Sequence, residues 1–260
     1  QAALVGHDEH AVARHVGELC RQLGGLPLAI ELAAALARYR SVDEVFGRLV
    51  GSLTGPESGQ GATTAGPLRA ALGWSCERLR ASQLRALRRL GVFRGRFDVA
   101  AAEAVCGGET ELEPALDRFV ALGLLHTHRE PSATRYSMPG IVAAYLEQVY
   151  PDPAGQAEAE AAHLRHYADA CRDPRFLDTD LLARVDASYA DYLQALKTGM
   201  ADAEGGRPVA AAPDADADLD AATYDLAISL QLYWLWQMRS HVALPWLDRI
   251  AVRFAGSPVR

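Results

Sequence analysis

The histidines and cysteines are the residues whose types could bind a metal ion or carry nucleophilic catalysis. The histidines that lie close together in sequence are His7, His10 and His15; His126 and His128; and His163 and His166. None of these groups has an obvious further ligand from elsewhere in the chain, so we expect no metal site. The four cysteines form no C-x-x-C pair, and no G-x-S-x-G turn occurs. We therefore expect no zinc site, no disulfide framework and no catalytic residues.

The chain contains a single lysine, Lys197, and no glycine-rich loop precedes it. A P-loop requires a lysine directly after its last loop glycine, because that ammonium group reaches the nucleotide phosphates. This sequence therefore contains no P-loop. We expect that the chain is not an enzyme and does not hydrolyse nucleotide by itself.

The composition excludes several classes of protein. The 260 residues are 50% hydrophobic and 23% charged, with 33 acidic and 26 basic side chains and a formal net charge of −7. These values are typical of a globular protein and exclude collagenous, mucin-like and disordered chains. No apolar run reaches the roughly 18 to 20 residues of a membrane helix, and the dispersed cysteines favour a reducing compartment. We expect a cytoplasmic protein without membrane contact and, because it starts at Gln1 within a helical pattern, a fragment of a longer polypeptide.

Apolar residues recur at helical spacing along most of the chain, which predicts a mainly α-helical fold. Residues 1–55 predict a small helical domain, and residues 56–66, rich in Gly, Ser and Thr, predict a linker. Residues 67–150 predict helices followed by two short extended runs, LLHTH and RYSM, separated by REPSAT. Helices followed by a β-hairpin are the order of a winged helix-turn-helix unit.

A third helical region follows the PDPAG stretch. Residues 156–260 predict antiparallel helices that resemble the opening of a tetratricopeptide-like solenoid, although no clean 34-residue repeat is present. The helix ISLQLYWLWQM is apolar on most sides, so other elements must cover it on several faces. Within this region we predict a solvated acidic loop at residues 201–220. This stretch contains only one arginine to balance the aspartates Asp214, Asp216, Asp218 and Asp220.

Three stretches of sequence carry a family resemblance: LCRQLGGLPLAIELAAALARYR, then PLRAALGWSCERLRASQLRALRRLGVFRGRFD, then DRFVALGLL with RYSMPGIVAAYL. In this order they resemble the C-terminal half of the nucleotide-switch module of STAND-class (NB-ARC) signalling ATPases. The AfsR-like and LuxR-like bacterial transcriptional regulators are the most similar subfamily. The resemblance covers most of residues 10–260, closely to about residue 150 and loosely afterwards. It implies an ARC-like helical domain, a winged helix and helical repeats.

The resemblance also implies which residues lie near nucleotide. In the family the GLPLA proline packs against the adenine of ADP, which implies an adenine edge at Gly25, Leu26 and Pro27; alternatively, Pro27 only begins a helix. The family's Met-His-Asp triplet, whose histidine reaches the ADP phosphates, corresponds here to Met138, Pro139 and Gly140. Proline has no side-chain donor, so this phosphate-sensor position is degenerate. The P-loop and the acidic residues for magnesium would lie upstream of Gln1, so ADP or ATP with magnesium is expected only together with that upstream domain.

Arginines are concentrated on the first two helices of the predicted winged helix and on the turn after them. The set is Arg69, Arg78, Arg80, Arg85, Arg88, Arg89, Arg94 and Arg96. Three interpretations of these side chains are open. They form a solvated face, or they form a docking surface for the upstream nucleotide-binding domain or an acidic partner, or they contact nucleic acid. The candidates for a docking surface are Arg78, Arg85, Arg88 and Arg89.

The helix before the wing argues against DNA binding. At roughly residues 111–122 it carries Glu111, Glu113 and Asp117 against one arginine, Arg118. Acidic side chains are repelled by phosphates, so we expect no direct DNA binding by this chain.

The resulting hypothesis is a non-catalytic regulatory relay within a STAND-type, ATP-dependent transcriptional regulator. Nucleotide held upstream would bias how the helical and winged units pack on the ATPase core. A protein or small-molecule inducer on the C-terminal helices would shift that balance. The alternatives are a winged-helix DNA-binding protein and a helical protein-interaction scaffold.

Overall fold

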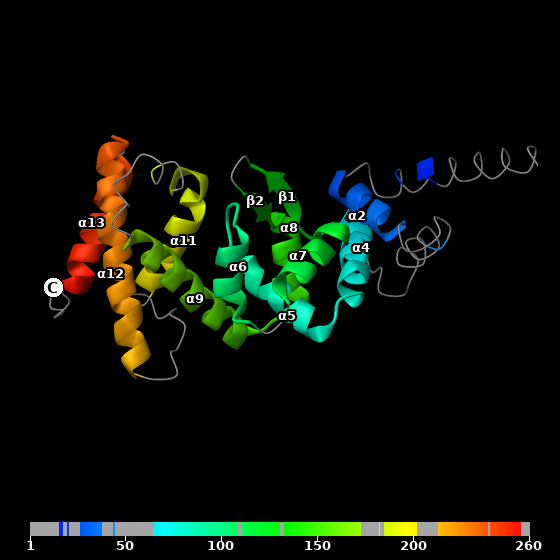
Figure 1. The fold of residues 1–260 in the computed structure, drawn as a ribbon, viewed down its shortest axis with the longest axis horizontal. Coiled ribbons are helices and arrows are strands. Elements are labelled where there is room, and N and C mark those ends of the chain that lie inside the picture. The colour runs from blue at the N-terminus through cyan, green and yellow to red at the C-terminus, as the bar shows by residue number, and fades with distance from the viewer. Residues whose placement is uncertain are drawn as a thin grey trace, which may run out of the picture.

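The computed structural model describes residues 16, 17, 20, 27–37, 44, 65–108, 111–130, 133–172, 182, 185–201, 213–238 and 240–255. Over these residues the protein is mainly α-helical with one two-stranded sheet, which confirms the predicted fold class. The elements follow one another along the long axis of the molecule (Figure 1). Helices α2 (Pro27–Ala37) and α4 (Ala65–Glu77) lie at one end, and α12 (Pro213–Trp236) and α13 (Ser240–Phe254) at the other.

A winged helix occupies the middle of the molecule. Its elements, in chain order, are α5 (Ala81–Arg89), η1 (Leu90–Val92), α6 (Val99–Cys106), α7 (Leu112–Ala121), β1 (His126–Arg129), β2 (Thr134–Ser137) and α8 (Gly140–Val149). The two strands pair antiparallel, with Thr127 opposite Tyr136. Phe97, in the segment between η1 and α6, exchanges both backbone hydrogen bonds with Tyr136, at 2.7 and 2.9 Å, and so forms an isolated antiparallel β-bridge to β2. The order of helices and strands is that of a winged helix-turn-helix unit.

Local capping signals define the helix ends of this unit. The Asp98 carboxylate accepts a hydrogen bond from the Ala101 backbone N–H at 2.9 Å, which caps the first turn of α6. Gly107, with φ of 67°, caps the C-terminal end of α6, and the turn after α7 contains Gly123 with φ of 71°. Glycine takes this left-handed conformation without a steric cost. The helices then bury a common core in which Leu87, Leu116 and Phe119 have no exposed surface.

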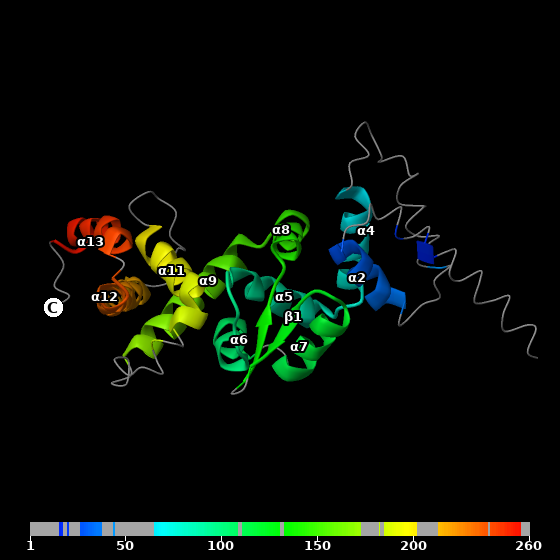
Figure 2. The same ribbon diagram turned by 90° about the horizontal axis from the view of Figure 1, so that it is seen from above.

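The helix α9 (Pro153–Cys171) is shared between the winged helix and the C-terminal helices. It packs against α5, η1 and α6 on one side and against α11 (Tyr189–Met200) and α12 on the other. Figure 2 shows it lying between the two groups. The helix α13 covers α12 at the end of the row. In the part of the chain that the structure describes, no helix is long and apolar enough to cross a membrane.

The structure corrects the predicted acidic loop at residues 201–220. The helix α12 begins at Pro213, so all four aspartates of the acidic stretch are helical. Two carboxylates of the stretch pair with arginines of other helices: Asp218 with Arg165 of α9 at 2.8 Å, and Asp220 with Arg253 of α13 at 2.8 Å. These pairs offset part of the negative charge on which the prediction of a solvated loop rested. The helix α4 begins at Ala65, so the last two residues of the predicted linker, 65 and 66, are helical. Residues 202–212 lie outside the described part.

The crossing of α11 and α12 requires a glycine. A Cβ atom at Gly199 would overlap Thr223 Oγ1 and would lie 2.7 Å from Thr223 Cγ2. Thr223 is fully buried, and its hydroxyl donates to the Leu219 carbonyl at 2.6 Å, so it has little freedom to move away.

We therefore expect Gly199→Ala to lower the free energy of unfolding by about 1 to 3 kcal/mol, even though alanine is the better helix former. Gly91→Ala is the control, because a Cβ there would meet no atom within 4 Å, and we expect no loss of stability. Urea denaturation followed by circular dichroism measures both. Equal stability of the two variants would contradict the close crossing.

Candidate functional site

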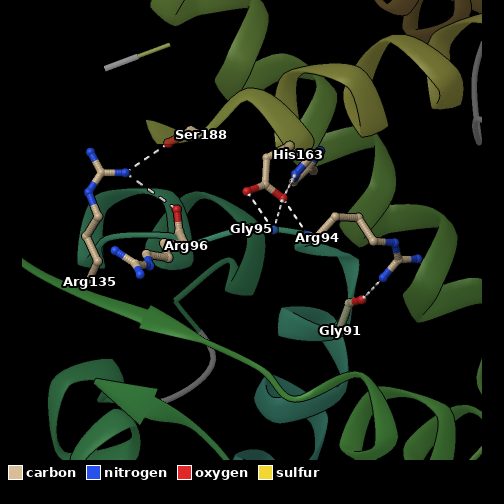
Figure 3. Close-up of polar contacts among 8 residues, drawn as sticks. Gly91, Arg94, Gly95, Arg96, Arg135, His163 and Ser188 are labelled. Atoms are coloured by element: carbon tan, nitrogen blue, oxygen red, sulfur yellow. Dashed lines mark hydrogen bonds and ion pairs between the residues drawn. The ribbon is translucent and has the colours of Figure 1, made fainter. Parts of the chain in front are cut away.

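A buried carboxylate joins the winged helix to the C-terminal helices. Asp191, in the first turn of α11, has no exposed surface. Its Oδ1 accepts the backbone N–H of Arg94 at 2.5 Å, and its Oδ2 accepts that of Gly95 at 3.1 Å. Arg94 and Gly95 form the turn that leads from η1 to Phe97. Figure 3 shows these two residues beside His163 at this junction.

The close approach explains the glycine in the turn. A Cβ atom at Gly95 would lie 2.8 Å from Asp191 Oδ2. Real Cβ contacts of this length are essentially never seen, and Asp191 cannot withdraw without losing its hydrogen bonds. Gly95 is therefore needed for the carboxylate to reach the backbone.

His163 brings α9 to the same point. Its Nε2 lies 3.6 Å from Asp191 Oδ1, and its side chain is fully buried. Neither ring nitrogen has a hydrogen-bond partner among the described residues. The ring packs edge-on against Phe93 at 5.2 Å between centroids, and at a tilt against Tyr167 at 4.7 Å. Burial raises the pKa of Tyr167 far above its ordinary value. Three elements, the turn after η1, α9 and α11, thus meet around one carboxylate.

The wing is tied to the same helices. Arg135, on β2, donates from Nη1 to Ser188 Oγ at 2.9 Å, just before α11 begins (Figure 3). Its Nε lies 3.1 Å from the Glu130 carboxylate at the end of the hairpin. A cavity of about 260 Å³ beside these residues is lined by Arg135 and by His166 of α9. Burial lowers the pKa of His166, which favours the neutral ring there.

Three of the four arginines predicted as a docking surface come together in the structure. Arg85, Arg88 and Arg89 line a cavity of about 440 Å³ between the end of α5 and the start of α9, whereas Arg78 does not line it. Arg88 Nη2 lies 3.0 Å from Asp152 Oδ2. Arg89 pairs with a carboxylate of α9, that of Glu158. Two of these arginines therefore hold α9 against α5, and their role in docking another domain stays a prediction.

The structure describes only some of the residues that the sequence predicts to lie near nucleotide. Gly25 and Leu26 lie outside the described residues, and Pro27 is the first residue of α2, with its side chain outside the described part. Met138 is half-buried against the core, and Pro139 precedes α8, its carbonyl accepting the Val142 N–H at 2.9 Å. Gly140 is exposed. The assignment of the adenine edge and of the degenerate phosphate sensor therefore stays a prediction.

The helix that carries Pro27 rests on the winged helix. Leu32 is fully buried, and its Cδ2 would lie 3.3 Å from a Cβ at Gly123, just after α7. Glu31 lies 3.5 Å from His126 Nε2 at the start of β1. The described part of the N-terminal domain is thus docked at the junction of α7 and the wing.

Sequence reasoning missed the Asp191 junction. The sequence analysis considered His163 and His166 only as possible metal ligands. The described residues contain no group of three or more His, Cys, Asp or Glu side chains that could hold a metal ion. A signal was present: Asp191 lies at the spacing of Ala195 and Thr198, which are buried on the same face of α11. An acidic residue on a buried helical face must have a partner, but the sequence does not identify that partner.

The fold is therefore that of a winged helix hydrogen-bonded to a helical unit, and known proteins are similar to it in sequence. The chain is 31% identical over 253 residues to a protein of Mycobacterium tuberculosis named "Putative HTH-type transcriptional regulator" and equally to one of Mycobacterium bovis. The match covers 92% of this chain but 26% of each relative, so the chain spans about a quarter of the length of these proteins. An uncharacterized Mycobacterium tuberculosis protein is 38% identical over 111 residues, which is 41% of this chain and 28% of that protein. No family model matches. The similarity is to one part of proteins named as transcriptional regulators and supports a transcriptional-regulator family.

We expect Asp191→Ala to lower the free energy of unfolding by about 3 kcal/mol, because it leaves two backbone N–H groups without an acceptor. Glu103→Ala, at an exposed position of α6, is the control and should change stability little. Thermal unfolding of the purified chain measures both variants. An Asp191→Ala variant as stable as the control would show that the junction is not held by this carboxylate.

Proposed function

We propose that this chain is a regulatory relay within a cytoplasmic, bacterial, STAND-type transcriptional regulator whose nucleotide-binding domain lies elsewhere in the same polypeptide. The relay is non-catalytic. It transmits the nucleotide state of that domain to the C-terminal helices, on which a protein or small-molecule inducer acts. ADP or ATP with magnesium would be bound only together with the upstream domain.

The single observation that carries this proposal is the Asp191 junction. A relay requires that a movement of one unit be imposed on the next, and a loose linker between the units would not do this. Here the turn of the winged helix is hydrogen-bonded to α11 through a fully buried carboxylate. The similarity to proteins named as transcriptional regulators supports the regulatory part of the proposal, and the nucleotide-dependent part rests on the GLPLA and winged-helix sequence motifs alone.

Hydrogen exchange in the intact regulator tests the relay. We expect the exchange rates of α9 and α11 to differ between the ADP-loaded and ATP-loaded forms. Asp191→Asn should abolish this difference while leaving ADP affinity unchanged, because the substitution removes the coupling and not the nucleotide site. A purely structural scaffold would instead show no nucleotide dependence in the unmodified protein, and that result would refute the proposal.

The adenine edge is tested separately by Pro27→Ala in the intact regulator. If Pro27 packs against adenine, ADP affinity should fall by about three- to ten-fold, as expected for a lost apolar contact of about 1 kcal/mol. Pro139→Ala is the matched control, because proline at that position offers no side-chain donor. If Pro27→Ala changed neither ADP affinity nor activation, Pro27 would serve only to begin the helix and would not pack against adenine.

A second candidate function is DNA binding by the winged helix, which its topology favours. The charges oppose it, since Glu111, Glu113 and Asp117 are exposed on or next to α7 while Arg118 is half-buried. We expect a mobility-shift titration of this chain with duplex DNA to show no shift at low salt. Tight binding that weakens steeply as salt is added would instead establish the winged helix as a DNA reader.

A further inference from the structure

A cavity of about 440 Å³ lies beneath the elbow between α8 and α9. One wall is formed by the end of α5, by η1 and by the turn after it, and the other by the end of α8 and the start of α9. The volume is within the range of small-molecule sites, about 300 to 1,000 Å³. None of the residues Met138–Gly140 lines it, so it is distinct from the degenerate phosphate-sensor position.

The first wall is cationic. It carries four guanidinium groups, those of Arg85, Arg88, Arg89 and Arg94. Arg88 pairs with Asp152 at 3.0 Å, and Arg94 donates from Nη1 to the Gly91 carbonyl at 2.8 Å. A guanidinium group has five N–H donors, so neither of these contacts uses all the donors of its arginine. Burial lowers the pKa of Arg88, so further negative charge beside it would stabilise its cationic form.

The second wall is rich in acceptors. Glu147 and Glu160 lie on it, together with Gln156, whose amide donates to the Glu160 carboxylate at 2.9 Å. Leu146 and Tyr150 add apolar surface. These carboxylates would repel a ligand that is anionic throughout, but they accept hydrogen bonds from hydroxyl groups. The two walls together suit a ligand with an anionic group at one end and hydroxyls at the other.

We propose that this cavity binds a small phosphorylated, hydroxyl-bearing metabolite. The phosphate faces the arginines of α5 and η1, because guanidinium groups match its geometry and charge. The hydroxyls face Glu147 and Glu160. Binding at this site does not depend on the proposed relay, so either proposal can fail without the other.

Isothermal titration of the full 260-residue chain with glucose 6-phosphate tests the site. Glucose and inorganic phosphate are titrated alongside, each supplying one half of the ligand. We expect glucose 6-phosphate to bind at least about ten-fold more tightly than either, because it alone contacts both walls. Equal binding of glucose or of inorganic phosphate, or no binding of glucose 6-phosphate up to roughly 10 mM, would overturn the proposal.

Two arginine variants then locate the binding. Arg94→Gln removes an exposed guanidinium that lines the cavity, and we expect affinity for glucose 6-phosphate to fall about ten-fold. Arg129→Gln removes an exposed arginine on β1 that does not line it, and affinity should be unchanged. Circular dichroism checks that both variants remain folded. Unchanged affinity in Arg94→Gln, or an equal fall in both variants, would show that the ligand does not occupy this cavity.

Discussion

A carboxylate without solvent must be hydrogen-bonded, because an unpaired buried charge costs several kcal/mol. Asp191 meets this requirement with the backbone N–H groups of Arg94 and Gly95, which lie almost a hundred residues earlier in the chain. α11 therefore cannot slide or tilt away from the turn after η1 without leaving donors and acceptor unpaired. This constraint fixes the C-terminal helices relative to the winged helix, and the proposed relay depends on it.

The helix α9 is held in the same way at its other end. Asp152 caps its first turn by accepting the Gly155 N–H at 3.0 Å, and the same carboxylate pairs with Arg88 of α5. The elbow between α8 and α9 is thus fixed by one carboxylate at its start and by the His163 and Asp191 contact further along. A ligand in the arginine-lined cavity would lie directly against the first of these contacts.

The homology and the geometry address different parts of the protein's role. Similarity across 92% of the chain supports a regulatory family. In the proposed relay, the buried junction would be the means by which one part of the protein acts on another. The exposed carboxylates of Glu113 and Asp117 on α7 disfavour contact of this face with phosphates.

Local interactions made part of this fold predictable from sequence. The cap at Asp98 and the left-handed turn at Gly123 act within a few residues, so the sequence alone determined the fold class and the succession of helices and hairpin. Other features depended on residues far away. The helix that begins at Pro213 has aspartates paired with Arg165 of α9 and with Arg172 just after it, and Asp191 is buried where a distant turn supplies its donors. Only the tertiary structure could decide these, because pairing and burial depend on which elements pack together.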